Sequence, residues 1–167
     1  MQISTDKIKE LRELSGAGIM ECKKALLEAE GDLGKALKCL KQRGFIKAEK
    51  KAERKVEQGL IEAYIHAGGR IGAMVELNCE TDFAAHTNEF KELAHNLALQ
   101  VAALSPRYVS QGEIPQGVEV QPQEVCLLLQ PFIKEPERTI QDIINDTIAK
   151  IGENIKIKRF VRYELGG

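Results

Sequence analysis

Residues 60–79 read LIEAYIHAGGRIGAMVELNC, and this stretch decides the fold of the chain. Apolar side chains alternate up to Ile65, the pair Gly68-Gly69 allows a tight turn, and a second run with strand-like composition extends from Ile71 to Cys79. Two such runs joined by a short glycine turn predict an antiparallel β-hairpin.

The stretch Ile155 to Leu165 predicts a further strand, one face of which would carry Ile155, Ile157, Val161, Tyr163 and Leu165. Each strand also has apolar residues on its second face, as the pairs Leu60 and Tyr64 against Ile61 and Ile65 show. A sheet with one face in water alternates more cleanly. We therefore expect helices of this chain on one face and a second subunit on part of the other, with contributions from Tyr64, Met74 or Phe160.

Two longer segments with helical periodicity are expected to cover the first face. They run from Asn88 to Leu104, ended by Ser105-Pro106, and from Thr139 to Ile151, ended by Gly152. Pro106, Pro115, Pro122, Pro131 and Pro136 all fall between these helices. Proline interrupts regular structure, so this stretch predicts a loop with at most a short extended piece at Val125 to Leu129.

The N-terminal part predicts a small bundle of three short helices over residues 4–44. Ser4 or Thr5 can cap the first helix, which Gly16 ends; the second runs from Ile19 to about Ala29; Asp32 can cap the third, which ends before Gly44. The predicted fold class is α+β, with a bundle at 1–46, a charged linker at 47–57 and a core at 58–167. A bundle of this size suits docking and is too small for a substrate pocket.

The charge distribution argues against nucleic acid as a direct partner. The net charge is −1, and the largest segment, residues 59–155, is acidic. Lys47 to Lys55 is basic and would be either a surface for RNA or an acidic protein, or a solvated helical linker; its glutamates weaken the field and favour the linker. An RNA-binding alternative would add Lys156, Lys158, Arg159 and Arg162 of the last strand.

Several other classes of function have no support in the sequence. Cys22, Cys39, Cys79 and Cys126 are scattered, which is typical of reduced thiols in a cytosol-like compartment. His86 and His95 would lie near opposite sides of a helix and make a poor metal pair. We expect no cofactor, no metal and no covalent chemistry. No apolar run approaches the roughly 20 residues of a membrane span, and the N-terminus has no signal-peptide pattern.

Three motifs in order carry a resemblance to a known family. They are Leu-Arg-x-x-(Ser/Thr)-Gly-Ala-Gly-x-Met-(Asp/Glu)-x-Lys-x-Ala-Leu at Leu11 to Leu26, the run from Val75 to Phe83, and the run from Ile148 to Ile155. On these motifs the chain resembles translation elongation factor Ts, in its short form with one core copy. The resemblance implies a UBA-like N-terminal bundle, a homodimer, and nucleotide exchange on the GTPase elongation factor Tu. It also implies the cytoplasm as the compartment, either a bacterial-type cytosol or its organellar descendant.

The resemblance also implies partner-binding residues. Phe83, with Thr81 and Asp82, follows the second strand and would enter the nucleotide-binding domain of elongation factor Tu. Arg12, Ile19 and Met20 would hold another face of that domain, and His66 matches a histidine that faces the GTPase in longer members. From the residues alone, Phe83 could instead close the core, Ile19 and Met20 could be bundle core, and His66 could have no role.

The chain departs from the family pattern in one place. Members normally have a block of helices between the segments that match Ser105 to Val109 and Gln130 to Phe132, where this chain has only about twenty residues containing Pro and Gly. A rival function of another class is a non-catalytic adaptor or chaperone or ribosome-binding module that uses the N-terminal bundle. That alternative leaves Thr81, Asp82 and Phe83 without a role.

Overall fold

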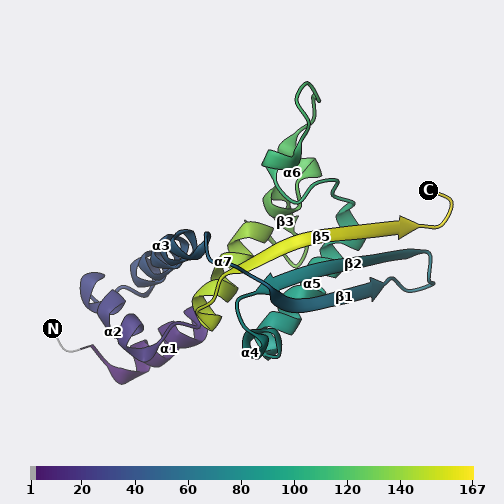
Figure 1. The fold of residues 1–167 in the computed structure, drawn as a ribbon. Coiled ribbons are helices and arrows are strands. Elements are labelled where there is room, and N and C mark those ends of the chain that lie inside the picture. The colour runs from purple at the N-terminus through teal and green to yellow at the C-terminus, as the bar shows by residue number, and fades with distance from the viewer. Residues whose placement is uncertain (1–2) are drawn as a thin grey trace.

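The computed structural model describes residues 3–167 and shows an α+β chain, as predicted (Figure 1). A helical bundle lies at one side, and a three-stranded sheet backed by helices forms the rest. The principal elements are α1 (Thr5–Ser15), α2 (Ile19–Glu28), α3 (Leu33–Lys51), β1 (Gln58–Ile65), β2 (Ile71–Cys79), α4 (Asp82–Ala85), α5 (Asn88–Leu104), α7 (Ile140–Ile151) and β5 (Ile155–Glu164).

The bundle forms because its helix ends are specified locally. The Ser4 side chain accepts a hydrogen bond from the Lys7 amide, and the Asp32 side chain accepts one from Lys35, so α1 and α3 are capped as predicted. Gly16 adopts the left-handed conformation (φ 65°) that ends α1. The bundle core is built from small and medium apolar side chains: Leu11, Cys22, Ala25, Leu26, Ala29, Ala36 and Leu40.

Helix α3 is longer than predicted. It does not end before Gly44 but continues to Lys51, through the first half of the segment predicted as a linker. At Gly44 it crosses α7 closely, since a Cβ placed there would lie 3.7 Å from that of Ala149. Ala48, one turn later, is buried in the core of the sheet domain. Packing against α7 therefore overrides the local preference of glycine to stop the helix.

The sheet has the order β1-β2-β5 and is antiparallel throughout. Its register shifts between Glu76 and Leu77, which pair with Arg159 and Ile157 and leave Lys158 unpaired. Such a bulge reverses the faces of the residues that follow it. The prediction that Val161 and Tyr163 share a face with Ile155 and Ile157 is therefore wrong.

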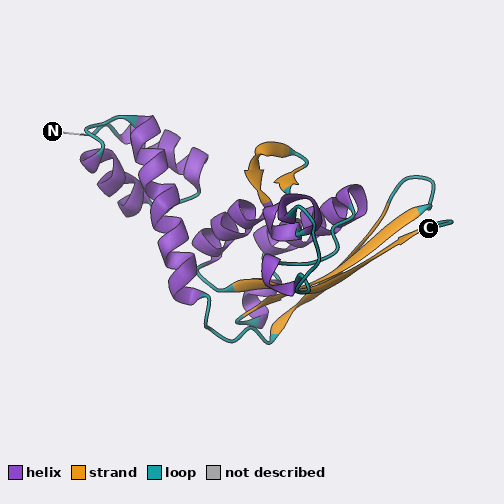
Figure 2. Cartoon of the chain, turned by 90° about the horizontal axis from the view of Figure 1, so that it is seen from above, coloured by secondary structure: helices purple, strands orange, loops and turns teal. Residues whose placement is uncertain are grey.

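The covered face of the sheet packs on α5, which lies across β1, β2 and β5, while α7 packs on α5 and α3. Figure 2 shows the core helices gathered on one side of the sheet. Tyr64 and Phe160 point into this layer and pack against the core. They cannot contribute to the opposite face, contrary to expectation; of the three residues named, only Met74 lies there, as it pairs with Val161.

The face of the sheet that no helix covers carries exposed apolar side chains. We call it the open face and define it by Ile61, Ile65, Met74, Val161 and Tyr163. They lie on three neighbouring strands in register, so they form one continuous surface. A patch of this kind on a sheet is typical of an interaction surface.

The proline-containing stretch is more ordered than predicted. It contains short helical turns η1 (Gln111–Glu113), α6 (Pro122–Val125) and η2 (Leu127–Leu129), followed by a hairpin of β3 (Pro131–Phe132) and β4 (Glu135–Thr139). Val125 to Leu129 is thus mostly helical rather than extended. The hairpin is anchored by the buried Gln100 of α5, which donates to the Pro131 carbonyl at 3.0 Å and accepts from the Ile133 amide at 3.0 Å.

Candidate partner-binding site

Phe83 is held out into solvent by a short capped helix. The Thr81 hydroxyl accepts a hydrogen bond from the Ala84 amide at 3.3 Å and begins α4. Ala84 and Ala85 are buried against the core, whereas the Phe83 side chain is 88% exposed. The alternative in which Phe83 closes the core is therefore wrong. A large aromatic ring carried by a helix that is anchored to the core is suited to inserting into a partner protein.

Asp82 lies beside this ring and is also exposed. Its carboxylate Oδ1 lies 3.4 Å from Nδ1 of His86, one turn along, and the same nitrogen lies 2.8 Å from the Asp82 carbonyl oxygen. Asp82 thus presents a solvent-accessible negative charge next to an apolar ring. That combination can disturb both the packing and the electrostatics of a bound protein.

The bundle presents a second exposed surface. Ile19 and Met20 form the first turn of α2 and are 54% and 73% exposed, and Arg12 on α1 is exposed as well. They are not bundle core, so that alternative is wrong. The next residue, Glu21, pairs with Lys47 of α3, and this contact lowers the pKa of the Glu21 carboxyl. The pair ties the exposed turn to the long helix.

Both surfaces flank the C-terminal end of α7. On the bundle side, Gly16 lies against Lys150: a Cβ placed on the glycine would stand 2.6 Å from Cε of the lysine. On the core side, Glu153 binds Thr81, the residue that begins α4. The end of α7 therefore contacts the bundle at Gly16 and the start of α4 at Thr81.

His66 lies far from these residues. It follows β1 at the hairpin tip, whereas Phe83 follows the opposite end of β2; the nine residues of β2 correspond to about 26 Å. Its Nδ1 lies 3.1 Å from the Tyr64 hydroxyl. Within one chain, the structure does not bring His66 together with the other predicted site residues.

Two of the buried cysteines have shifted pKa values. Burial raises the pKa of the Cys79 thiol to about 11 and raises that of Cys126 as well, so both stay protonated near neutral pH. Within residues 3–167, no group of three or more His, Cys, Asp or Glu side chains is placed to hold a metal ion. In the same part of the chain, no helix combines the length and apolar character needed to cross a membrane.

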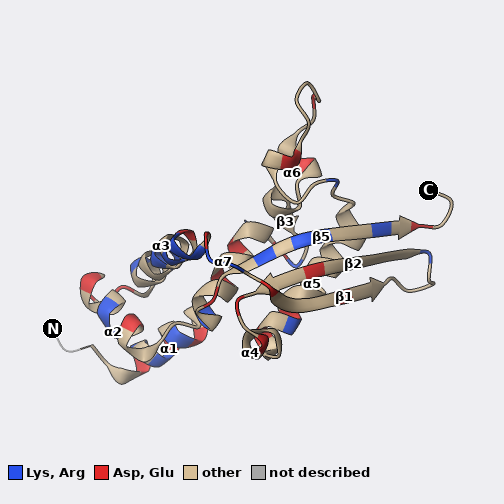
Figure 3. Ribbon diagram, viewed as in Figure 1, with Lys and Arg blue, Asp and Glu red and all other residues tan. Residues whose placement is uncertain are grey.

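Figure 3 shows Lys and Arg spread over the bundle helices and β5.

The residues that hold α4 in place were not predicted from the sequence. Glu80, Glu153 and Asn154 form polar contacts around Thr81 that join three segments distant in sequence. The available signal was the placement of an acid and an amide between Gly152, which ends α7, and Ile155, which begins β5.

Comparison with known proteins gives one consistent result. The family model described as Elongation factor TS matches residues 40–121 and 117–167. Proteins named Elongation factor Ts from Thermoanaerobacter sp. (strain X514), Carboxydothermus hydrogenoformans and Thermotoga neapolitana are 47%, 48% and 45% identical. These alignments cover 98%, 98% and 99% of this chain and 95%, 89% and 98% of the relatives.

The same comparisons place a deletion in this chain. Each of the three alignments extends over 194 positions, against the 167 residues present here, so at least 27 positions of each relative face a gap. The family model matches in two pieces that meet at residues 117–121. The break falls between α5 and α7, where the sequence predicted that a block of helices is missing.

Proposed function

Because the chain belongs to the elongation factor Ts family, we propose that it is a guanine-nucleotide exchange factor for elongation factor Tu. It binds the GDP-bound GTPase and promotes GDP release during translation elongation. The observation that carries this proposal is the exposure of Phe83, which stands beside Asp82 on a helix fixed to the core. The chain performs no covalent chemistry itself.

The mechanism is conformational. Phe83 inserts between helices of the nucleotide-binding domain and shifts them, because tightly packed interiors respond to such insertion by discrete movements. Asp82 brings a carboxylate towards the site of the Mg²⁺ and the phosphates and weakens their binding. The factor and the nucleotide then lower each other's affinity by the same ratio, as linkage requires. GDP leaves, and the rebinding of GTP releases the factor.

Docking is the role of the bundle in this proposal. Arg12, Ile19 and Met20 contact a second face of the same domain, so that binding energy from the bundle is available to drive insertion of Phe83. The exposure of these three side chains in the free chain supports the role.

The active form in this proposal is a homodimer that pairs the open faces of two sheets. Apolar surface on three adjacent strands favours a self-complementary contact with two-fold symmetry. A two-fold axis that lies between the two faces and runs perpendicular to the strands would turn the hairpin tip of one protomer towards the α4 end of the other. His66 would then act on the GTPase held by the partner. The bacterial origin of the relatives supports work in a bacterial-type cytosol.

The test measures release of a fluorescent GDP analogue from elongation factor Tu, chased with excess unlabelled nucleotide. We expect the wild-type protein to accelerate release in a saturable manner. Binding without acceleration would favour the adaptor alternative, and absence of binding would reject both.

A further inference from the structure

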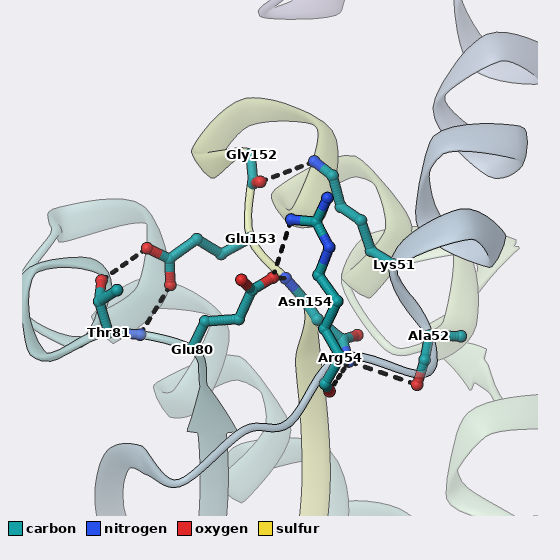
Figure 4. Close-up of polar contacts among 8 residues, drawn as sticks. All are labelled: Lys51, Ala52, Arg54, Glu80, Thr81, Gly152, Glu153 and Asn154. Carbon is teal, nitrogen blue, oxygen red and sulfur yellow. Dashed lines mark hydrogen bonds and ion pairs between the residues drawn. The ribbon is translucent and has the colours of Figure 1, made fainter.

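Thr81 is held by a single carboxylate at two points. The Thr81 amide donates to Oε2 of Glu153 at 3.0 Å, and the Thr81 hydroxyl donates to Oε1 at 2.5 Å (Figure 4). The same hydroxyl oxygen accepts from Ala84 and caps α4. Hydrogen bonds to a charged acceptor are stronger than neutral ones, and two of them prevent rotation about either. The start of α4 is thus fixed in direction as well as in place.

A second set of contacts joins this point to the end of α3. The Glu80 carboxylate accepts a hydrogen bond from the backbone N–H of Asn154 at 2.7 Å and lies 3.5 Å from the Arg54 guanidinium. The buried Asn154 side chain donates to the carbonyls of Ala52 at 3.4 Å and Arg54 at 2.9 Å. Lys51 donates to the Gly152 carbonyl at 2.7 Å. We call these eight residues the clasp: Lys51, Ala52, Arg54, Glu80, Thr81, Gly152, Glu153 and Asn154.

The clasp has a specific consequence for Phe83. An isolated helix of four residues has no stability of its own, so the direction of α4 depends on its contacts. Ala84 and Ala85 fix one face of it against the core, and Glu153 fixes its start. Phe83 itself, being exposed, contributes little to holding the helix. The direction of Phe83 therefore depends on Glu153, 70 positions away in the sequence, together with the packing of Ala84 and Ala85.

We infer that Glu153 is a positioning residue for exchange: it aims Phe83, and through the clasp it sets the placement of Phe83 relative to the docking bundle. The inference rests on the proposed exchange function. It assigns Glu153 no contact with the partner or nucleotide. Binding energy from the docked bundle can drive insertion of the Phe83 ring only if α4 is held rigidly. A loosely held ring would move aside instead of displacing the partner's helices.

The test compares Glu153→Ala and Glu153→Gln with wild type in the exchange assay, with Glu137→Gln as a matched control. Glu137 is an exposed acid on β4, outside the clasp. For Glu153→Ala we expect the maximal stimulated rate to fall about three- to tenfold, while the factor concentration for half-maximal effect stays near wild type. Glu153→Gln keeps the shape and one acceptor, so it should retain more of the rate. Glu137→Gln should match wild type.

Two further measurements separate positioning from general damage. Amide hydrogen exchange at residues 82–85 should be faster in Glu153→Ala, while thermal melting of the whole protein stays close to wild type. In a Phe83→Ala background, Glu153→Ala should cause no further loss, because the residue acts only through the ring; a merely structural effect would lower the rate equally in both backgrounds.

The outcomes are distinguishable. If wild type does not accelerate GDP release, the exchange function is wrong and the inference falls with it. If wild type is active and Glu153→Ala has the same maximal rate, only the positioning role is wrong. An equal loss with and without Phe83 would also overturn it. If Glu153→Ala fails to fold, the isosteric Glu153→Gln decides by the same comparison of backgrounds.

Discussion

At the scale of single residues, α4 separates exposed from buried side chains within one turn. Phe83 is exposed, while the adjacent Ala84 and Ala85 are buried. We expect Phe83→Ala to melt near wild type, because a ring already in water loses little packing, and to slow stimulated GDP release substantially. Phe90→Ala is the matched control: because the Phe90 ring is buried, its removal should lower the free energy of unfolding by about 3–5 kcal/mol. Full exchange activity in Phe83→Ala would reject the insertion mechanism.

Asp82→Asn isolates the charge beside the ring. The substitution keeps the shape of the side chain and removes only its negative charge, so the loss of exchange rate should be smaller than for Phe83→Ala. The same GDP-release assay measures both. A larger loss for Asp82→Asn would mean that electrostatic disturbance, rather than insertion of the ring, dominates release.

Cys79 gives the stability a pH dependence. Burial raises the pKa of its thiol to about 11, above the value of about 8.5 for a free thiol. A raised pKa contributes stability that is fully present below the unfolded pKa and is lost as pH rises towards the folded value. Stability relative to Cys79→Ala should therefore fall between about pH 9 and pH 11. Urea denaturation of both proteins at several pH values measures this difference, and a constant difference would contradict it.

At the scale of elements, Gly44 of α3 offers a stabilising substitution. Alanine is favoured over glycine inside a helix by about 0.8–1 kcal/mol. A Cβ at this position would meet Ala149 of α7 at 3.7 Å, an ordinary contact. Gly44→Ala should thus raise the free energy of unfolding by up to about 1 kcal/mol, whereas Gly44→Ile should lower it by crowding α7. Thermal denaturation checks both, and destabilisation by alanine would mean that the helices approach more closely.

The first turn of α2 should control affinity rather than rate. Met20→Glu places a charge on an exposed position, so the fold should be unaffected. We expect the concentration for half-maximal exchange to rise, with the maximal rate retained at saturation. Leu27→Glu, also exposed and on the same helix, is the control and should behave as wild type. Equal effects of the two substitutions would indicate general electrostatic repulsion instead of a defined docking turn.

Most elements were predictable because their signals are local. Caps at Ser4, Asp32 and Thr139 and the left-handed residues after α1, α5 and α7 specify helix ends without reference to the rest of the chain. What could not be predicted depends on distant partners. The length of α3 depends on α7, and the β3-β4 hairpin depends on the buried Gln100. Which side chains of β5 point to the covered face depends on the pairing with β2, which leaves Lys158 unpaired.

The candidate site follows the same division. The resemblance located Phe83, Ile19 and Met20, and the structure resolved the question of their burial. Neither periodicity nor motif revealed that Glu153 holds Thr81, because the contact joins residues 72 positions apart and leaves no local pattern.

At the scale of the whole molecule, the open face predicts self-association. Val161 lies on this face and Phe160, its neighbour, lies on the covered face. Val161→Lys should shift the protein towards monomer in light scattering while it still melts like wild type. Phe160→Lys should instead lower stability, since it buries a charge against the core. A wild-type mass of one chain at micromolar concentration would reject the homodimer.

The link between α3 and the core also has a consequence in time. Asn154 binds the carbonyl of Ala52, which precedes it by 102 residues. During synthesis at roughly 5–20 residues per second, roughly 5–20 s separate the appearance of these two residues. The bundle has its own apolar core and can fold within that interval. The hydrogen bonds between Thr81 and Glu153 that hold the start of α4 cannot form until Glu153 has been synthesised. A growing chain can therefore fold the bundle that we propose for docking several seconds before Glu153 is present to hold Thr81, and with it the helix that carries Phe83.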